Sequence, residues 1–396
     1  MLKKKRLFTP GPTPLLPAAQ VAMAAANMHH RTAKFRQLYR RTLADLKEFI
    51  GTANDVLLLA SSGTGAMEAA VTNLTSPGDK VVVLTAGKFG ERWRDLAKTF
   101  GCAVEIVSAD YGETFANGAI QAALSEDARA VFVQATESST GARHDVRAIG
   151  ELVRSHAPKA MLVVDAITGL GTTRLAVDEC GVDVIIGGSQ KALMVPPGLA
   201  YMAVSERAWR RMEETSSLRY YFDLRKERKA AAKGESAFTP ATSLVAAMAA
   251  ALDYLRDAGG GSVAAGRDLL VENAETCAAM TRAAAVALDL KLFAPRSPAA
   301  ALTAILPPAG VESGNIVAGL RQQFGAIAAN GQGEMKGQLF RIAHIGYYDY
   351  LDTIGIIGAL EQVLVSLDAR VELGHGLRAA QEVYAQRGTR ESVAAH

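Results

Sequence analysis

The sequence has few cysteines, no long apolar runs and no strong excess of charge of either sign. Its three cysteines, Cys102, Cys180 and Cys277, are widely separated, so neither a disulfide framework nor a zinc site is indicated. The seven histidines form no ligand pattern either, and we expect no metal site. A formal net charge of +3 gives no reason to expect nucleic acid or a membrane surface as a partner.

We also expect neither a targeting segment nor a membrane-spanning segment in this sequence. No apolar run approaches the roughly 20 residues that cross a bilayer, and the basic start, Lys3 to Arg6, lacks the apolar segment of a signal peptide. We therefore expect a cytoplasmic protein. The 396 residues suffice for two unequal domains, because single cores seldom grow past about 250–300 residues.

The first two hundred residues do contain a regular alternation of apolar runs with helix-length spacers. The runs lie at 55–60, 80–84, 103–107, 130–135, 161–166, 182–188 and 199–204. Strands that are apolar on both faces indicate an α/β fold, a doubly wound and mostly parallel sheet with helices on both sides. In such sheets ligands bind just beyond the carboxyl ends of the strands, so function is expected at that rim.

The pattern changes at the glycine-rich segment 258–262. We expect three parts: an N-terminal arm of residues 1–18, a large α/β domain of residues 19–258, and a smaller C-terminal α+β domain of residues 259–396. In the last part the sequence predicts a long alanine-rich helix, strands at 289–294, 301–306 and 338–346, a helix at 315–324 and a last helix at 351–367.

Polar turns follow two of the predicted strands. Ser61 to Glu68 is a run rich in small residues that opens a helix, and free N–H groups and hydroxyls there suit a phosphate. An ordinary helix cap is the alternative. The segment matches neither the Walker pattern nor GxGxxG, which argues against a nucleoside triphosphate or a dinucleotide. Thr136 to Gly141 forms a second polar turn at the same rim.

Two charged residues also stand at this rim. Asp165 emerges at the end of the strand 161–166, where a loop cap is the alternative role. Lys191 follows the strand 182–188 and precedes Pro196 and Pro197, which can continue neither a strand ladder nor a helix. A solvated loop lysine is the alternative there.

A phosphate site, a carboxylate and a lysine on one rim form a restrictive chemical set. Pyridoxal 5'-phosphate needs an anchor for its phosphate, an anion beside its ring nitrogen and a lysine that bonds to its aldehyde carbon. Partial burial would favour the reactive, uncharged amine of that lysine. The three requirements together therefore predict this cofactor.

Several segments carry a family pattern: FTPGPTPLLP, SSGTGAMEAAVTNL, GKFGERW, ESSTG, VVDAITGLGTTRLAVDECGVDVIIGGSQKALMVPPGLA and FRIAHIG. Through them, nearly the whole chain resembles a class V (fold type I) pyridoxal-phosphate aminotransferase of the alanine–glyoxylate and serine–pyruvate or serine–glyoxylate group. The resemblance implies the fold type I architecture and a homodimer with active sites at the interface.

The resemblance also implies roles for single residues around the cofactor. Lys191 corresponds to the lysine bonded to the cofactor, and Asp165 to the partner of the ring nitrogen. Phe89 takes the place of the aromatic residue stacked on the ring, and Ser138 that of the residue at the 3'-oxygen. The residues implied at the phosphate are Ser62, Gly63, Thr64, Gln190 and, reaching over from the partner subunit, Thr239.

Substrate binding is assigned in the same way. Arg341 corresponds to the arginine that binds the substrate α-carboxylate, for which two parallel guanidinium hydrogen bonds are suited. A solvated or ion-paired strand arginine is the alternative. Gly11, in the rigid stretch Phe8 to Pro12, is expected over the active site near the dimer interface. Ser236 departs from the pattern, because some relatives have tyrosine there, and Tyr220 to Phe222 could line the pocket or belong to the core.

The predicted activity is transfer of an amino group from alanine or serine to glyoxylate or pyruvate by a ping-pong mechanism. Ureidoglycine is another possible donor within the group. A cysteine desulfurase would need a histidine where Phe89 stands and a mobile cysteine, and a nucleotide-binding dehydrogenase would need a fingerprint after the first strand. A non-catalytic subunit that retains the fold is the remaining alternative, although it would have no need of Lys191 and Asp165 together.

Overall fold

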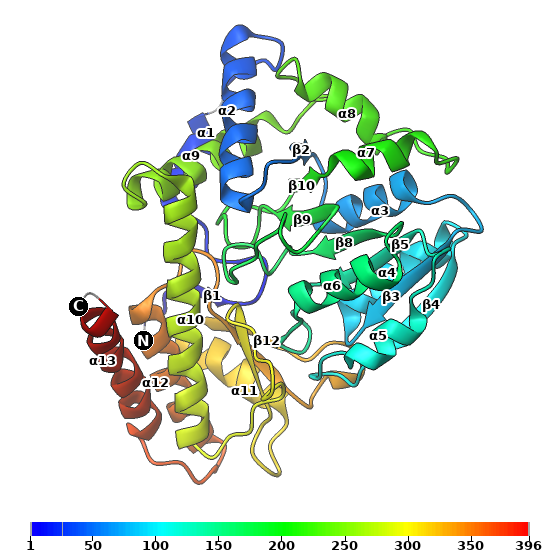
Figure 1. Cartoon of the computed structure of the whole chain (residues 1–396). Coiled ribbons are helices and arrows are strands. Elements are labelled where there is room, and N and C mark those ends of the chain that lie inside the picture. The colour runs from blue at the N-terminus through cyan, green and yellow to red at the C-terminus, as the bar shows by residue number, and fades with distance from the viewer. Residues whose placement is uncertain (1, 26, 395–396) are drawn as a thin grey trace.

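The computed structural model describes residues 2–25 and 27–394. Its large sheet has seven strands in the order β2-β10-β9-β8-β5-β3-β4 (Figure 1). β10 runs antiparallel to its neighbours β2 and β9, and the other pairs are parallel, which confirms a mostly parallel sheet. The strands are β2 (Asp55–Leu59), β3 (Lys80–Thr85), β4 (Ala103–Ser108), β5 (Ala130–Gln134), β8 (Met161–Asp165), β9 (Val184–Gly188) and β10 (Ala200–Val204).

Except in the largely exposed edge strand β4, consecutive residues of these strands enter two separate cores, one on each face of the sheet. Along β8, Leu162 and Val164 belong to one apolar cluster, whereas Val163 between them belongs to the other. Because side chains alternate across a strand, burial on both faces requires apolar residues at every position. The helices in this part are α1 (Pro17–Ala25), α2 (Ala33–Ile50), α3 (Gly63–Leu74), α4 (Lys88–Thr99), α5 (Asn117–Ala123), α6 (Val146–His156), α7 (Glu206–Glu213), α8 (Leu224–Ala231) and α9 (Thr242–Ala258).

The second sheet has four strands in the order β1-β12-β13-β11. β1 (Arg6–Phe8) comes from the expected N-terminal arm and pairs in parallel with β12 (Ala326–Asn330). β13 (Phe340–Ala343) runs antiparallel to β12 and to β11 (Leu302–Ile305). The other elements here are α10 (Val263–Ala287), α11 (Ser313–Gly319), the π-helical turn Leu320–Phe324, the 3₁₀ turn Gly333–Met335, α12 (Tyr350–Ser366) and α13 (His375–Ala394).

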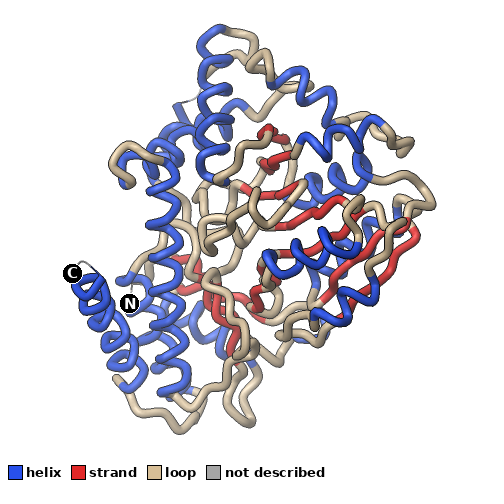
Figure 2. Tube along the Cα trace, in the orientation of Figure 1, coloured by secondary structure: helices blue, strands red, loops and turns tan. Residues whose placement is uncertain are grey.

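The long helix α10 connects the two parts of the molecule. It packs against α2 and α9 beside the large sheet and against α12 and α13 beside the small one (Figure 1). Figure 2 shows the strands of both sheets enclosed by helices and loops. The glycine-rich turn before α10 lies where the sequence changes character, and the domain boundary at residues 258 and 259 stays a prediction.

Two expectations for the C-terminal part are wrong. Residues 289–294 form no strand, because only Leu292 bridges to Ile305 and Asp289 turns the chain with a φ of 55°. The helix expected at 351–367 is present as α12, but it is not the last, since α13 follows. α13 was not predicted because its sequence is largely polar, although it packs extensively against α10 and also against α12, with Ala380 in the apolar contact.

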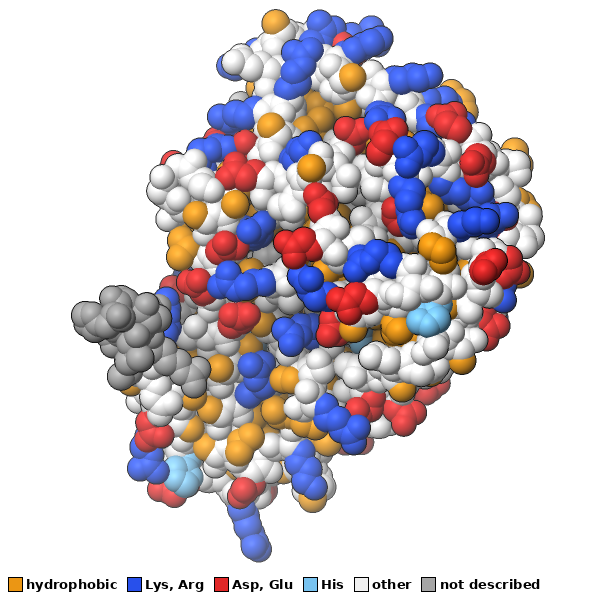
Figure 3. Space-filling view, in the orientation of Figure 1, with side chains coloured by type: hydrophobic (Ala, Val, Ile, Leu, Met, Phe, Trp, Pro, Cys, Tyr) orange, Lys and Arg blue, Asp and Glu red, His pale blue; other side chains and the backbone are white. Residues whose placement is uncertain are grey.

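The surface matches the balanced composition. Acidic and basic side chains are interspersed over the face shown in Figure 3. No helix in the described residues has a stretch long and apolar enough to cross a membrane.

Candidate active site

The predicted residues meet at the carboxyl ends of the parallel strands. Asp165 is the last residue of β8, and Lys191 lies in the turn that follows β9. β8 and β9 are paired neighbours, so their ends lie next to each other. The first turns of α3 and α4 follow β2 and β3 at the same edge. The topology therefore gathers these side chains as the sequence predicts.

Lys191 is buried, with 8% of its surface exposed. Its Nζ donates a hydrogen bond to the carbonyl oxygen of Pro10, and Thr13 Oγ1 donates to the Lys191 carbonyl at 3.0 Å. The N-terminal strap, residues 9–14, thus covers the lysine. A Cβ on Gly11 would lie 2.6 Å from Nζ and would have to displace it, and the φ of 151° at this position also favours glycine.

Burial also makes Lys191 a better nucleophile. It lowers the pKa of Lys191 from 10.5 to about 8, with help from the positive charges of Arg341 and Arg92 and against the opposing effect of Asp165. A measurable fraction of uncharged amine is therefore present near neutral pH. A solvated loop lysine, the alternative, would be neither buried nor shifted in this way.

Asp165 has one carboxylate oxygen engaged and one available. Oδ1 accepts a hydrogen bond from the backbone N–H of Ile167 at 2.9 Å, the loop contact that a capping role predicts. Oδ2 has no hydrogen-bond donor among the described residues and can accept one from a protonated ring nitrogen. Burial raises the pKa of Asp165 to about 6, with help from the charge of Glu137 and partly offset by the hydrogen bond from Ile167 and the charges of Lys191 and Arg92. The carboxylate is therefore ionised at neutral pH.

The start of α3 is open for an anion. Ser62 is the N-cap residue, but its side chain makes no capping hydrogen bond, and within the described residues the N–H groups of Gly63 and Thr64 have no acceptor. A Cβ on Gly63 would lie 2.2 Å from Ile167 Cδ1, so glycine lets the helix start approach the loop after Asp165. The buried Oε1 of Gln190 also lacks a partner. These groups fit a phosphate.

Phe89 is held by a residue that the sequence analysis did not single out. Glu137 Oε2 accepts hydrogen bonds from the N–H groups of Phe89 at 3.0 Å and Gly90 at 3.2 Å, and its Oε1 accepts from the N–H of Ser139 at 3.1 Å. Burial raises the pKa of Glu137 despite these donors. Glu137 lies in the short hairpin of β6 (Thr136–Glu137) and β7 (Ala142–Arg143), inside the segment ESSTG, which was the available signal.

Arg341, in β13, is buried without an anionic partner. Its Nη1 donates to the Ser138 carbonyl at 2.7 Å and its Nη2 to the Asn330 carbonyl at 2.6 Å. Nε is buried and has no acceptor, and no carboxylate pairs with the guanidinium within the described residues. Burial lowers the pKa of Arg341 to about 10, and the charge of Glu137 opposes the shift. A solvated or ion-paired strand arginine, the alternative, does not describe this site, which fits an incoming carboxylate.

The aromatic cluster and Thr239 lie outside this group. Tyr221 stacks on Phe238 with ring centroids 4.9 Å apart, and Tyr220 and Tyr221 are 74% and 48% exposed, so they are not core residues. Thr239 is exposed, and no described contact joins it to Lys191 or to the start of α3. Ser236 Oγ donates to Glu227 instead. The phosphate role of Thr239 therefore stays a prediction for a dimer.

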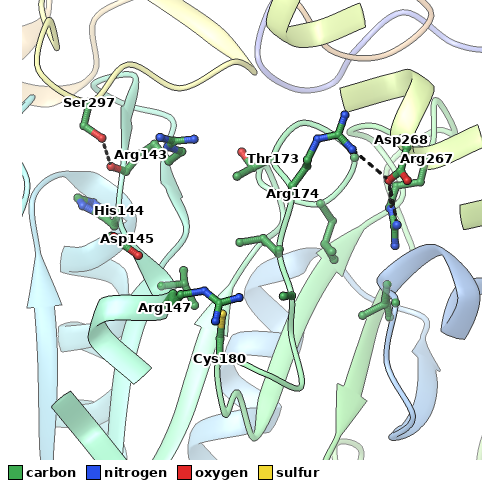
Figure 4. Close-up of a pocket in the computed structure, with 17 residues that line it drawn as sticks. Arg143, His144, Asp145, Arg147, Thr173, Arg174, Cys180, Arg267, Asp268 and Ser297 are labelled. Carbon is green, nitrogen blue, oxygen red and sulfur yellow. Dashed lines mark hydrogen bonds and ion pairs between the residues drawn. The ribbon is translucent and has the colours of Figure 1, made fainter. Parts of the chain in front are cut away.

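A cavity of about 720 Å³ lies elsewhere, between α6, the loop after β8 and α10 (Figure 4). Three of the four arginines on its walls are paired with acids: Arg147 with Glu179, Arg174 with Glu272 and Arg267 with Asp268. None of the predicted site residues lines it. The chemistry described above is therefore not located in this cavity.

The sequence of this chain is similar to a family model and to several known proteins. The family model described as aminotransferase class-V matches residues 18–279. The soluble hydrogenase 42 kDa subunit of Anabaena cylindrica is 38% identical and covers 96% of this chain and 99% of its own. The serine–glyoxylate aminotransferase of Methylorubrum extorquens is 31% identical and covers 95% of both chains.

A solved structure is also similar to this chain. It is the subgroup IV aspartate aminotransferase of Thermus thermophilus, with a TM-score of 0.84, 34% identity, and coverage of 91% of this chain and 99% of the other. The fold is therefore that of the fold type I aminotransferases. Because the family model spans more than half of the sequence, the chain belongs to the class-V aminotransferase family.

Proposed function

We propose that this protein uses pyridoxal 5'-phosphate to move an amino group from a small amino acid to a 2-oxo acid. One observation carries the proposal. A buried lysine with a lowered pKa lies near an ionised aspartate and a buried arginine that lacks an anion. These three groups are what a cofactor aldehyde, a ring nitrogen and a substrate carboxylate respectively require.

The residues of the site have different roles in this reaction. When bound, pyridoxal phosphate supplies an electron sink for the bond that breaks at the substrate α-carbon. Arg341 binds the α-carboxylate and thereby orients that carbon. The uncharged Nζ of Lys191 removes the proton from the α-carbon of the substrate. It would then deliver a proton to the aldehyde carbon of the cofactor. Asp165 keeps a proton on the ring nitrogen, because its carboxylate is ionised above about pH 6.

Neighbouring groups hold this arrangement in place. Glu137 fixes the start of α4 and with it the backbone of Phe89, the residue that we propose covers the ring. The carbonyl oxygen of Ser138 accepts a hydrogen bond from Arg341 and so holds the guanidinium beside the hairpin of β6 and β7. The strap at Pro10 and Gly11 lies over Lys191 and limits the access of water. One amino acid enters and leaves as a 2-oxo acid before the second 2-oxo acid enters, which is a ping-pong sequence.

We propose alanine or serine as donor and glyoxylate or pyruvate as acceptor. Serine and glyoxylate stand in the name of the Methylorubrum relative, and aspartate in that of the Thermus structure, so aspartate joins the donors to be tested. Ureidoglycine is a further candidate, because a ureidoglycine–glyoxylate aminotransferase of Bacillus subtilis has the same fold, with a TM-score of 0.89.

A half-reaction experiment tests the proposal. Purified protein loaded with pyridoxal phosphate is mixed with each donor alone, and the visible absorbance of the bound cofactor is followed. We expect it to fall with at least one donor and to return when glyoxylate or pyruvate is added. Lys191→Ala should bind no cofactor that borohydride can fix to the chain. An unchanged spectrum with every donor would instead support a non-catalytic subunit, and the Anabaena relative is named as a subunit, that of a soluble hydrogenase.

We also propose a homodimer with shared active sites. The exposed ring of Tyr221, which stacks on the half-buried Phe238, and the exposed Thr239 support it, because exposed aromatic rings are enriched at protein interfaces. Light scattering of the purified protein should give twice the mass of the chain. A monomer with full activity would contradict the shared site.

A further inference from the structure

Arg92, on α4, is a charged residue that the roles assigned so far leave unused. Its Nη1 donates a hydrogen bond to Thr64 Oγ1 at 3.1 Å, which ties it to the first turn of α3. Its guanidinium carbon lies 4.7 Å from the ring centroid of Phe89, close enough for a cation–π contact. Two contacts from different elements therefore hold the guanidinium between the expected phosphate site and the expected ring-stacking residue.

The charge of Arg92 is not neutralised by a neighbour. Together with Thr64 it lines an open cavity of about 530 Å³. The other charges on this cavity are paired: Lys88 with Glu91 at 2.9 Å, and Asp95 with Arg94 at 2.8 Å. Within the described residues no carboxylate forms an ion pair with Arg92.

Arg92 is also within electrostatic range of the catalytic residues. Its charge helps to lower the pKa of Lys191 and partly offsets the rise in the pKa of Asp165. A guanidinium has five N–H donors, and the contact with Thr64 uses one of them. The remaining donors are free for an anion at this position.

We propose that Arg92 is the cation that binds the phosphate group of the cofactor, alongside Thr64 and the N–H groups at the start of α3. The assignment rests on the proposed function, because it presupposes pyridoxal phosphate. A phosphate dianion needs more than backbone dipoles, and arginine binds phosphate through paired hydrogen bonds. The other cations near the site have different tasks, since Lys191 bonds to the cofactor and Arg341 holds the substrate carboxylate.

Two vitamers that differ only in the phosphate test this assignment. The dissociation constants of pyridoxal phosphate and of pyridoxal are measured with cofactor-free full-length protein, for the parent and for Arg92→Gln. We expect Arg92→Gln to weaken the binding of pyridoxal phosphate roughly tenfold to a hundredfold, the usual effect of losing a charge-assisted hydrogen bond. The binding of pyridoxal should change much less, because it makes no phosphate contact and loses only the effect of Arg92 on the pKa of Lys191.

Arg94→Gln is the matched control, because Arg94 lies on the same helix and is paired with Asp95. It should leave both constants near those of the parent. Arg92→Lys keeps the charge and should lose less affinity for pyridoxal phosphate than Arg92→Gln. This second variant also serves if the glutamine variant folds poorly.

The possible outcomes distinguish the role of Arg92 from the proposed function of the protein. Equal losses for both vitamers in Arg92→Gln would overturn the assignment and leave Arg92 as a support for Phe89. Unchanged binding of pyridoxal phosphate in Arg92→Gln would overturn it as well. A parent protein that binds neither vitamer would overturn the proposed function and the role of Arg92 with it.

Discussion

The pH dependence of Lys191 gives the sharpest prediction of the structure. Only the uncharged amine attacks the aldehyde carbon of the cofactor. With a pKa of about 8, roughly one Lys191 in ten is uncharged at pH 7, whereas an ordinary lysine with a pKa of 10.5 would give about one in three thousand. Burial therefore raises the reactive fraction about three-hundredfold at that pH.

The rate at which cofactor-free protein bonds to pyridoxal phosphate should follow this fraction. We expect it to rise about tenfold per pH unit at low pH and to level off near pH 8. Samples taken at intervals are reduced with borohydride, and the labelled Lys191 peptide is quantified by mass spectrometry. The phosphate charge also changes near pH 6, so the profile is compared with that of pyridoxal, which lacks this group.

Asp165 supplies an internal control for this prediction. Its negative charge raises the pKa of Lys191. In Asp165→Asn that effect is lost, so the rate should level off at a lower pH than in the parent. A parent rate that still rises above pH 9 would show that Lys191 is solvated and would refute the reasoning.

Three further substitutions test the remaining groups. Asp165→Asn should retain bound cofactor but lose most of its turnover, because an amide cannot hold the ring nitrogen protonated; near-normal turnover would leave Asp165 as a loop cap. Arg341→Lys should lower kcat/KM about tenfold to a hundredfold for carboxylate-bearing substrates, through loss of the paired hydrogen bonds. An amine without a carboxylate should react as with the parent, and equal efficiency with alanine or serine would remove Arg341 from the substrate site. Gly11→Ala should slow covalent attachment at Lys191 at least about tenfold, because the new methyl group would lie 2.6 Å from Nζ and must displace it. Gly78→Ala is the control, since Gly78 also has a positive φ but meets nothing within 4 Å, and an equal effect of both changes would indicate backbone strain instead.

The large sheet and the central residues of the site could be predicted from sequence because their signals are local. Apolar runs that are buried on both faces identify strands such as β8 without knowledge of their partners. The position of Lys191 between a strand and two prolines then places it at the rim. The topology rule for parallel sheets brings Asp165 beside it without further information.

The residues that were missed depend on contacts between distant segments. Glu137 accepts a hydrogen bond from the N–H group of Phe89, which lies 48 positions earlier in the chain. The residues next to Glu137 in the sequence do not predict this partner. Arg92 has an ordinary place on a helix until the start of α3 lies beside it. The supposed strand at 289–294 failed for a related reason, because a strand needs a partner ladder and this segment has a single bridge.

The N-terminal strap has a consequence for the order in which the protein matures during synthesis. β1 is made first, yet its partner in the sheet is β12, where Arg6 pairs with Ala326. β1 therefore has no strand to pair with until most of the polypeptide has left the ribosome. The strap that covers Lys191 lies between β1 and Thr13, which bonds to the Lys191 carbonyl, so one of the two anchors of the strap forms only at this late stage. A nascent or C-terminally truncated chain would thus hold the strap from one side only, and the finished sheet would mark the point at which both ends of the cover are fixed.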